Sequence, residues 1–159
     1  MLVQGKYLHY GDDLTDVFEI RKKVFQMEQG VPSEDEFDAI DDLAIHVIVY
    51  TTDTNKRPVA TGRVYFDGQN YRIGRVAVLK EERGKYYGDF AVRMLANKAF
   101  LAGASDIFIH AQTSVKSFYE KIGFQVDGDD FVEAGIKHIP MVIKSGALCK
   151  KCDNINRTV

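Results

Sequence analysis

The segment that most constrains the fold of this chain is residues 71–111, which alternate between strand and helix patterns. Tyr71–Leu79 and Ser105–Ala111 are rich in β-branched residues and indicate strands. Between them, Tyr87–Leu101 has helical spacing with an apolar stripe formed by Phe90, Ala91, Met94, Leu95, Ala99 and Phe100. A strand–helix–strand connection is a crossover that leaves its two strands parallel. The sequence therefore predicts two parallel strands in a mixed sheet.

A basic turn containing glycines joins the first of these strands to the helix. It reads Arg83-Gly84-Lys85-Tyr86-Tyr87-Gly88. Backbone N–H groups at a helix N-terminus point outward with the positive end of the helix dipole, and this arrangement binds phosphate. Glycines permit close backbone approach, and the two basic side chains add charge. From the residues alone, this segment is either a phosphate-binding turn or a solvated connection.

The remaining elements complete an α/β (α+β) pattern. The expected order is strand, helix, short helix, three strands, helix, strand, helix and two strands. The first long helix is expected at Asp12–Gln29, with Asp12 or Asp13 at its start, and the acidic stretch Ser33–Asp42 is expected to form a turn or short helix. The other predicted elements are strands Ala44–Thr51 and Pro58–Phe66, a hairpin turn at Asp67–Asn70, a helix at Val115–Lys121, and strands Phe124–Val126 and Gly135–Lys144 around a turn at Asp127–Asp130.

Length and charge restrict the organisation and the partners. With 159 residues, the chain is predicted to form a single domain, residues 1–145, followed by a polar tail, residues 146–159. A net charge of −2 argues against a nucleic-acid binder, and the lack of a long apolar run argues against a membrane span. No signal-peptide pattern begins the chain, so a cytoplasmic location is expected. Cys149 and Cys152 supply only two ligands, so no metal is expected and the pair has no assigned function.

Phrases spread along most of the chain resemble the GNAT acyltransferase superfamily, and in particular its ElaA/YjcF-like branch. The similarity runs from about Val17 to Lys144. The phrases that carry it are Ile20–Phe25 with Glu28–Pro32, Asp41-Asp42, His46, Thr61-Gly62-Arg63, Ile73–Val78, His110-Ala111-Gln112, Phe118–Phe124, Phe131 and Gly135–Met141.

This resemblance implies a GNAT acyl-CoA N-acyltransferase fold, in which helices flank a mixed twisted sheet and two parallel strands splay apart. The pantetheine arm of acetyl-CoA, the expected cosubstrate, would enter the gap and pair with an exposed strand edge. The backbone groups of Val76 and Val78 would bind it, beside Ala77. The pyrophosphate would lie on the turn formed by Arg83, Gly84, Lys85, Tyr86, Tyr87, Gly88 and Asp89.

Two residues of this turn depart from the family pattern. Tyr86 stands where the family has its first loop glycine, and a tyrosine resists positive φ and adds bulk. Asp89 places a carboxylate near the expected phosphates, although an acidic residue in a first helical turn also complements the helix dipole. Together they would weaken acetyl-CoA binding or adapt the site to another acyl-CoA.

The resemblance also implies residues for the chemistry, in which an amine attacks the thioester directly. A backbone N–H at Val76 or Val78 would stabilise the oxyanion. Tyr119 matches the tyrosine whose hydroxyl protonates the sulfur of coenzyme A, and its alternative role is as a core aromatic beside Phe118. Gln112 would bond the pantetheine.

The general base is left open by the sequence. Glu28 lies at the end of the first helix near the expected substrate groove, and is otherwise a surface carboxylate. His110 ends a parallel strand beside the cofactor gap. His46 and His138 lie within strand patterns, where a lone histidine is more often structural.

Two arginines and the acidic stretch are candidates for substrate binding. Arg63 and Arg75 alternate with apolar residues on neighbouring strands, where they would bind an acidic substrate group or pair with Glu28 or Asp41. The acidic residues 34–42 would either attract a cationic substrate or form a solvated face.

The sequence thus predicts an acetyl-CoA-dependent N-acetyltransferase that modifies a primary amine on a small molecule or peptide. The alternatives are a non-catalytic acyl-CoA-binding or sensing module and a plain interaction domain. A homodimer is an expectation taken from the family alone.

Overall fold

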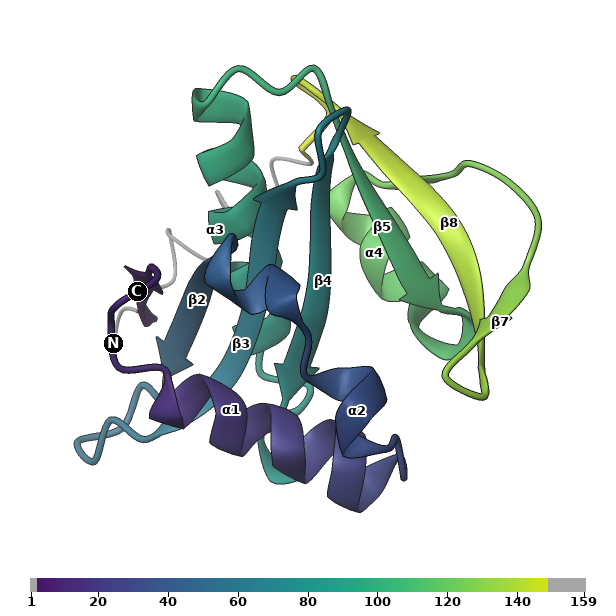
Figure 1. The fold of residues 1–159 in the computed structure, drawn as a ribbon. Helices are drawn as coiled ribbons and strands as arrows, with labels where there is room; N and C mark the ends of the chain where they lie inside the picture. Colours follow the sequence, from purple (N-terminus) through teal and green to yellow (C-terminus); the bar gives the residue numbers. More distant parts are fainter. Residues whose placement is uncertain (1–2, 149–159) are drawn as a thin grey trace.

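A computed structural model describes residues 3–148 as one eight-stranded sheet with helices on both faces (Figure 1). The strands lie in the order β1-β2-β3-β4-β5-β8-β6, with β7 also paired to β8. The strands are β1 Gln4–Leu8, β2 Ile45–Tyr50, β3 Pro58–Phe66, β4 Tyr71–Val78, β5 Asp106–Gln112, β6 Gln125–Val126, β7 Phe131–Glu133 and β8 Ile136–Lys144. The helical elements are α1 Thr15–Arg21, η1 Lys22–Glu28, α2 Ser33–Glu36, η2 Ala39–Asp42, η3 Lys80–Glu82, α3 Tyr87–Leu101, η4 Thr113–Val115 and α4 Lys116–Ile122.

The two faces of β2–β4 carry different helices, because side chains alternate along each strand. Val47 and Gly62 lie opposite each other in the β2–β3 register and face α3. A Cβ at Gly62 would lie 2.7 Å from Leu95 Cδ1, so glycine allows α3 to approach the sheet closely. His46 and Arg63 face the other side, which α1, α2 and η2 cover in Figure 1.

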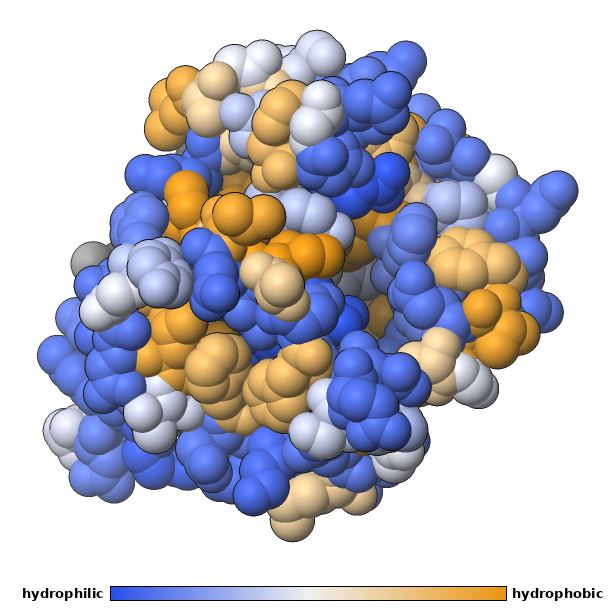
Figure 2. Space-filling model, viewed as in Figure 1, coloured by the Kyte–Doolittle hydropathy of each residue, from blue (hydrophilic) through white to orange (hydrophobic). Residues whose placement is uncertain are grey.

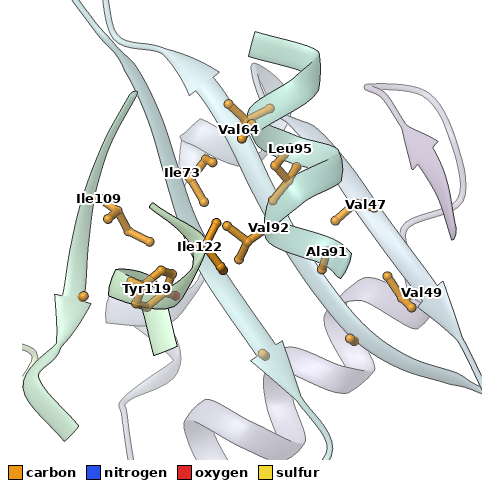
Figure 3. Close-up of a cluster of buried hydrophobic side chains, with 14 of the residues drawn as sticks. Val47, Val49, Val64, Ile73, Ala91, Val92, Leu95, Ile109, Tyr119 and Ile122 are labelled. Carbon is orange, nitrogen blue, oxygen red and sulfur yellow. The ribbon is translucent and has the colours of Figure 1, made fainter. Parts of the chain in front are cut away.

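The main apolar core lies between α3 and the sheet (Figure 3). Strand valines and the buried stripe of α3 meet there, and Ile122 and Tyr119 of α4 extend the cluster toward β5. The observed α3 has the bounds that the sequence predicts. Its fully buried residues are Ala91, Val92, Leu95 and Ala96.

The parallel strands β4 and β5 pair for only three residues and then separate. Their register is Tyr71↔Ile107, Arg72↔Phe108 and Ile73↔Ile109. Immediately beyond it, β4 is irregular against β3, and Arg75 adopts a left-handed backbone with φ of 52°. A bulge of this kind bends a strand and increases its twist. The predicted mixed sheet with splayed parallel strands is therefore confirmed.

Two local predictions were wrong. The helix expected at Asp12–Gln29 is α-helical only for Thr15–Arg21 and continues as a π-helix, with Gln29 N–H bonded to the carbonyl of Val24. No side chain caps α1, although Asp13 Oδ1 accepts from the Thr15 N–H and hydroxyl.

The C-terminal strands also differ from the expected pair. The short strand β7 comes between β6 and β8 in the chain, and its turn to β8 uses Ala134 and Gly135, both with positive φ. Positive φ at both central residues is the backbone of a type I′ hairpin turn. Gly135 therefore belongs to a turn and not to the last strand.

Some predictions concern parts of the chain that the structure does not test. Cys149, Cys152 and most of the polar tail lie outside the described residues. The division into a domain, residues 1–145, and a tail remains a prediction. Among residues 3–148, no helix has the length and apolar character needed to cross a membrane.

Candidate active site

A cavity of about 1130 Å³ occupies the gap between β4 and β5. Figure 2 shows this face of the molecule hollowed between the part built on β4 and the part built on β5 and β8. Residues from η1, α2, β4, the turn before α3, β5, α4 and the β7–β8 hairpin line the cavity. The segments that the sequence connects with cofactor and acceptor binding thus meet around one space.

The unpaired half of β4 presents its backbone to this cavity. The N–H of Leu79 donates to the carbonyl of Val59 on β3, at 2.9 Å. Successive residues of a strand point their amides to opposite sides, so the backbone groups of Val78 and Val76 face away from β3. Ala77, opposite Thr61, turns its backbone to β3.

The turn before α3 combines a strained backbone with free donors. Tyr86 has φ of 69°, a left-handed conformation costly for tyrosine, and its side chain is exposed. Gly84 also has positive φ, at 79°. The N–H groups of residues 84–86 have no hydrogen-bond acceptor within the described chain. A Cβ at Gly88 would lie 3.0 Å from Val78 Cγ2, so glycine lets the turn pack against β4.

Both basic side chains of the turn are engaged by carboxylates. Arg83 binds both oxygens of Glu28, at 2.6 and 2.8 Å, and its Nε donates to the Val78 carbonyl at 3.1 Å. Lys85 Nζ lies 2.8 Å from Glu82. The hydrogen bond from Arg83 holds the pKa of Glu28 below its usual range. In this state Glu28 is therefore a paired carboxylate and a weak base.

The last residues of the predicted turn have structural partners. Tyr87 is buried, and its hydroxyl accepts from the backbone N–H of Thr52 at 3.1 Å. Asp89 accepts from Arg93 Nε at 2.7 Å, one turn further along α3. This pairing partly neutralises the carboxylate near the turn.

Tyr119 and Gln112 line the cavity on the β5 side. Tyr119 is buried, with its ring against Phe118 and Phe124, and burial raises its pKa far above the usual value. It is therefore a core aromatic and a cavity residue at once. Gln112 exchanges amide hydrogen bonds with Gln29, at 3.0 and 3.3 Å. This amide pair bridges the cavity from β5 to the end of η1.

The histidines are placed very differently. His46 is buried under η2, where its Nε2 lies 3.0 Å from the Asp41 carbonyl, and burial lowers its pKa. It does not line the cavity. His110 and His138 do, and Glu133 lies beside both of them.

Comparisons with known proteins agree with this geometry. A profile of the family described as "Acetyltransferase (GNAT) domain" matches residues 24–145. The chain belongs to the GNAT acetyltransferase family. The Bacillus subtilis protein named "Uncharacterized N-acetyltransferase YjcF" is 34% identical over 132 residues, which cover 82% of this chain and 92% of that protein. The resemblance to YjcF seen in the sequence is thereby confirmed, and the chain is an acetyltransferase.

Solved structures show the same fold. Escherichia coli ElaA superposes with a TM-score of 0.78 at 24% identity, covering 90% of this chain and all of that one. An acyl-CoA N-acyltransferase from Pseudomonas aeruginosa gives 0.77 at 22% identity, covering 89% and 99%. The fold of this GNAT acetyltransferase is therefore shared well beyond the range of clear sequence similarity.

The arginines expected to bind substrate hold the acidic stretch of this GNAT domain. Arg63 binds Asp38 and Asp41, at 2.7 and 2.8 Å, and Arg75 donates to the backbone carbonyls of Asp35 and Glu36. The Nε of Arg63 is buried without a partner in the described residues.

Arg21 of α1 completes this buried network. It is 1% exposed and binds Glu36 and Asp41. Three carboxylates of the acidic stretch are therefore neutralised, while Glu34 and Asp42 remain exposed. Within residues 3–148, no group of three or more metal-ligating side chains is placed to hold a metal ion.

Sequence reasoning missed several residues of the cavity wall. Four of them lie on η4 and α4 at helical spacing: Ser114, Ser117, Phe118 and Lys121. That spacing is a signal in the sequence that could have identified them. Gln29 and Glu133 also line the cavity. Glu133 belongs to the unpredicted strand β7, and no motif in the sequence marks it.

Proposed function

We propose that this GNAT acetyltransferase moves the acetyl group of acetyl-CoA to a primary amine by direct attack of the amine on the thioester. The observation that carries the proposal is the continuous path formed by the free edge of β4 and the turn before α3. Backbone donors at Val76 and Val78 lead directly to the N–H groups of residues 84–86, which have no acceptor among residues 3–148. This path supports binding of a chain that ends in phosphates.

The residues around the cavity fit acetyl-CoA, which would supply the activated acetyl group. The volume of about 1130 Å³ exceeds that of ordinary small-ligand pockets. Arg83 would bind the pyrophosphate after exchanging the Glu28 carboxylate for phosphate oxygens. Lys85, half exposed beside Glu82, would add a second positive charge. The Asp89 carboxylate is already paired with Arg93 and therefore repels phosphate less than a free one.

The position of Tyr119 in the cavity lining supports a role as general acid. Its hydroxyl carries a proton at neutral pH, and burial, which raises its pKa, makes it a weaker acid than an exposed phenol. It would give that proton to the departing sulfur, while a backbone N–H of Val76 or Val78 stabilises the negative charge on the thioester oxygen.

The acceptor amine needs a base, because an alkylammonium is mostly charged at neutral pH. Glu28 would serve only after Arg83 releases it, whereas His110 is 43% exposed and has no arginine partner in the described residues. His110 is therefore the stronger candidate. Arg63 and Arg75 are better suited to shaping the acceptor side than to binding an acidic group, because their guanidinium groups are already paired.

One alternative function has a specific observation in its favour. The strained, exposed Tyr86 stands where the cofactor would approach the turn. A non-catalytic acyl-CoA-binding module would tolerate such a change, because it needs affinity without turnover. A cytoplasmic location, a homodimer and an acceptor of small-molecule or peptide type remain predictions.

The first experiment is calorimetric titration of the full-length protein with acetyl-CoA, followed by thiol release with a panel of primary amines. We expect micromolar binding and amine-dependent release of coenzyme A. Tyr119→Phe keeps the ring packing and should lower kcat about 10²-fold while leaving acetyl-CoA affinity unchanged.

The control is Tyr86→Gly, which removes bulk and strain at the turn without touching the acid. Binding without turnover for any amine would favour the non-catalytic module. If the wild type does not bind acetyl-CoA and Tyr86→Gly does, Tyr86 prevents acetyl-CoA from binding at this turn. An unchanged kcat in Tyr119→Phe would exclude the phenol as the acid.

A further inference from the structure

Four side chains form a cluster on the β5–β8–β7 wall of the cavity. His110 comes from β5, Phe131 and Glu133 from β7, and His138 from β8. The hairpin register brings them together, since Phe131 lies opposite His138 and Glu133 lies opposite Ile136. His110, Glu133 and His138 all line the cavity.

Glu133 lies between the two imidazoles. Its Oε1 is 3.3 Å from His110 Nδ1, and its Oε2 is 3.9 Å from His138 Nε2. Phe131 separates the rings, edge-on to His110 at 4.8 Å and stacked on His138 at 5.8 Å. The hydrogen bond with His110 lowers the pKa of Glu133, so the carboxylate is charged at neutral pH.

The contact with Glu133 determines which His110 nitrogen carries the proton. A carboxylate can only accept, so the Nδ1 of a neutral His110 must donate to it. The lone pair then lies on Nε2, which has no partner within the described chain. For His138 the same reasoning applies to a different acceptor, because its Nδ1 lies 2.7 Å from the Ile136 carbonyl.

We propose that Glu133 is a positioning residue that holds His110 with its proton on Nδ1, so that Nε2 removes a proton from the acceptor amine. This inference rests on the proposed acetyl transfer. A histidine is directed in this way by whatever its other nitrogen binds. Glu133 also stabilises the imidazolium that forms, because its charge lies beside Nδ1.

The acceptor ammonium first loses one proton to water, which frees the nitrogen lone pair. As that lone pair forms the C–N bond, a second proton moves from the nitrogen to His110 Nε2, and the C–S bond breaks. The departing sulfur takes the proton of the Tyr119 hydroxyl. Water then carries the proton from His110 back to Tyr119, which restores both groups.

The geometry favours His110 over the other candidate bases. Both oxygens of Glu28 are held by Arg83. His138 is buried and its Nδ1 is fixed by a backbone carbonyl, so its ring is less accessible than that of His110. His46 lies outside the cavity lining.

Nitrogen-15 NMR of the labelled full-length protein tests the positioning without any acceptor. We expect His110, assigned through His110→Gln, to carry its proton on Nδ1 at a pH where the ring is neutral. Glu133→Ala should move the population toward the Nε2–H form. The matched control is Glu120→Ala, which removes another exposed carboxylate, on α4, and should leave the tautomer unchanged. An unaltered tautomer in Glu133→Ala would overturn the proposal.

Kinetics with an amine that the enzyme accepts test the consequence. Glu133→Ala should lower kcat about 10-fold or more without changing the Kd for acetyl-CoA, and Glu133→Asp should recover part of the loss. His110→Gln should lower kcat at least as much, and Glu133→Ala should then add nothing. If His110→Gln lowers kcat and Glu133→Ala does not, the positioning role of Glu133 is refuted. If no amine is turned over, the proposed function itself fails, and the NMR result still decides the tautomer.

Discussion

The two walls of the cavity both contain carboxylates, but they use them differently. On the η1–α2 wall, Glu36 is 1% exposed and is bound by Arg21 of α1, which is itself 1% exposed. On the β5–β8–β7 wall, Glu133 is 48% exposed and lies beside two imidazoles. The first carboxylate lies in a buried ion network, and the second faces solvent and the cavity.

This difference indicates a structural role for the first carboxylate and a chemical role for the second. A guanidinium stays charged at any physiological pH, so the Arg21 network is a fixed scaffold. It ties α1 and the acidic stretch to β3 and to the bulge of β4. An imidazole has one ring nitrogen that can donate a proton and one that can accept one, so the Glu133 cluster can exchange protons. We therefore expect changes on the first wall to affect folding and changes on the second to affect activity.

The largest expected effect comes from Glu36→Ala. Removing one partner leaves the Arg21 guanidinium buried with less compensation, and loss of a buried partner typically costs about 3–5 kcal/mol. Urea unfolding at neutral pH measures this change. Glu34→Ala, an exposed carboxylate on the same short helix, should change stability by less than about 0.5 kcal/mol. Equal effects of the two variants would show that the buried ion pair of Glu36 does not stabilise the fold.

The pH dependence of stability sharpens the comparison on the first wall. Burial alone would raise the pKa of Asp41, but the hydrogen bonds and charges of Arg21 and Arg63 outweigh it and lower the pKa. Its contribution is thus fully present above the unfolded value of about 3.9 and is lost as the pH falls through the lower folded value. Asp41→Asn should be clearly less stable than wild type at pH 7.

The stability difference between wild type and Asp41→Asn should then shrink steadily below about pH 4, as the wild-type carboxylate becomes protonated. Urea titrations at pH 7, 5, 4 and 3 measure it. A difference that stays constant over this range would show that the Asp41 charge does not stabilise the fold.

The smallest expected effect is that of Glu133→Ala on stability. Exposed ion pairs contribute about 0–1 kcal/mol, and both side chains of the Glu133–His110 pair are nearly half exposed. Thermal unfolding should therefore move by a few degrees at most. A loss as large as that of Glu36→Ala would mean that the cluster is structural, and would break the division between the two walls.

Local patterns predicted most of the fold. The helical spacing of apolar residues in Tyr87–Leu101, with a β-branched strand on each side, predicted the parallel strands β4 and β5. This was possible because the spacing of apolar residues along an element indicates which of its residues are buried. The π-helical end of the first helix and the three-residue strand β7 were not predictable in this way. The π-helix differs from an α-helix only in that its N–H groups bond five residues back and not four, and β7 is too short to show an alternating pattern.

The candidate site was predictable where it is a contiguous backbone segment. It was less predictable where it depends on side chains that pair across the fold. The turn at residues 83–89 is contiguous, so its composition could be read directly. The partners of Arg83 and Arg63 lie 55 and 25 residues away, and no local pattern connects them. Glu133 becomes significant only because a hairpin folds it onto β5.

The splay between β4 and β5 has a consequence for how the protein avoids unwanted association. A sheet normally has its free edges at its two sides, but this one also exposes edge strands in its middle. Such edges can template pairing with another chain. Here they are recessed in the cavity, and the Gln29–Gln112 amide pair crosses above it. In the proposed function a slender acyl arm would lie along β4, whereas a polypeptide strand, with side chains on both faces, would first have to break that bridge.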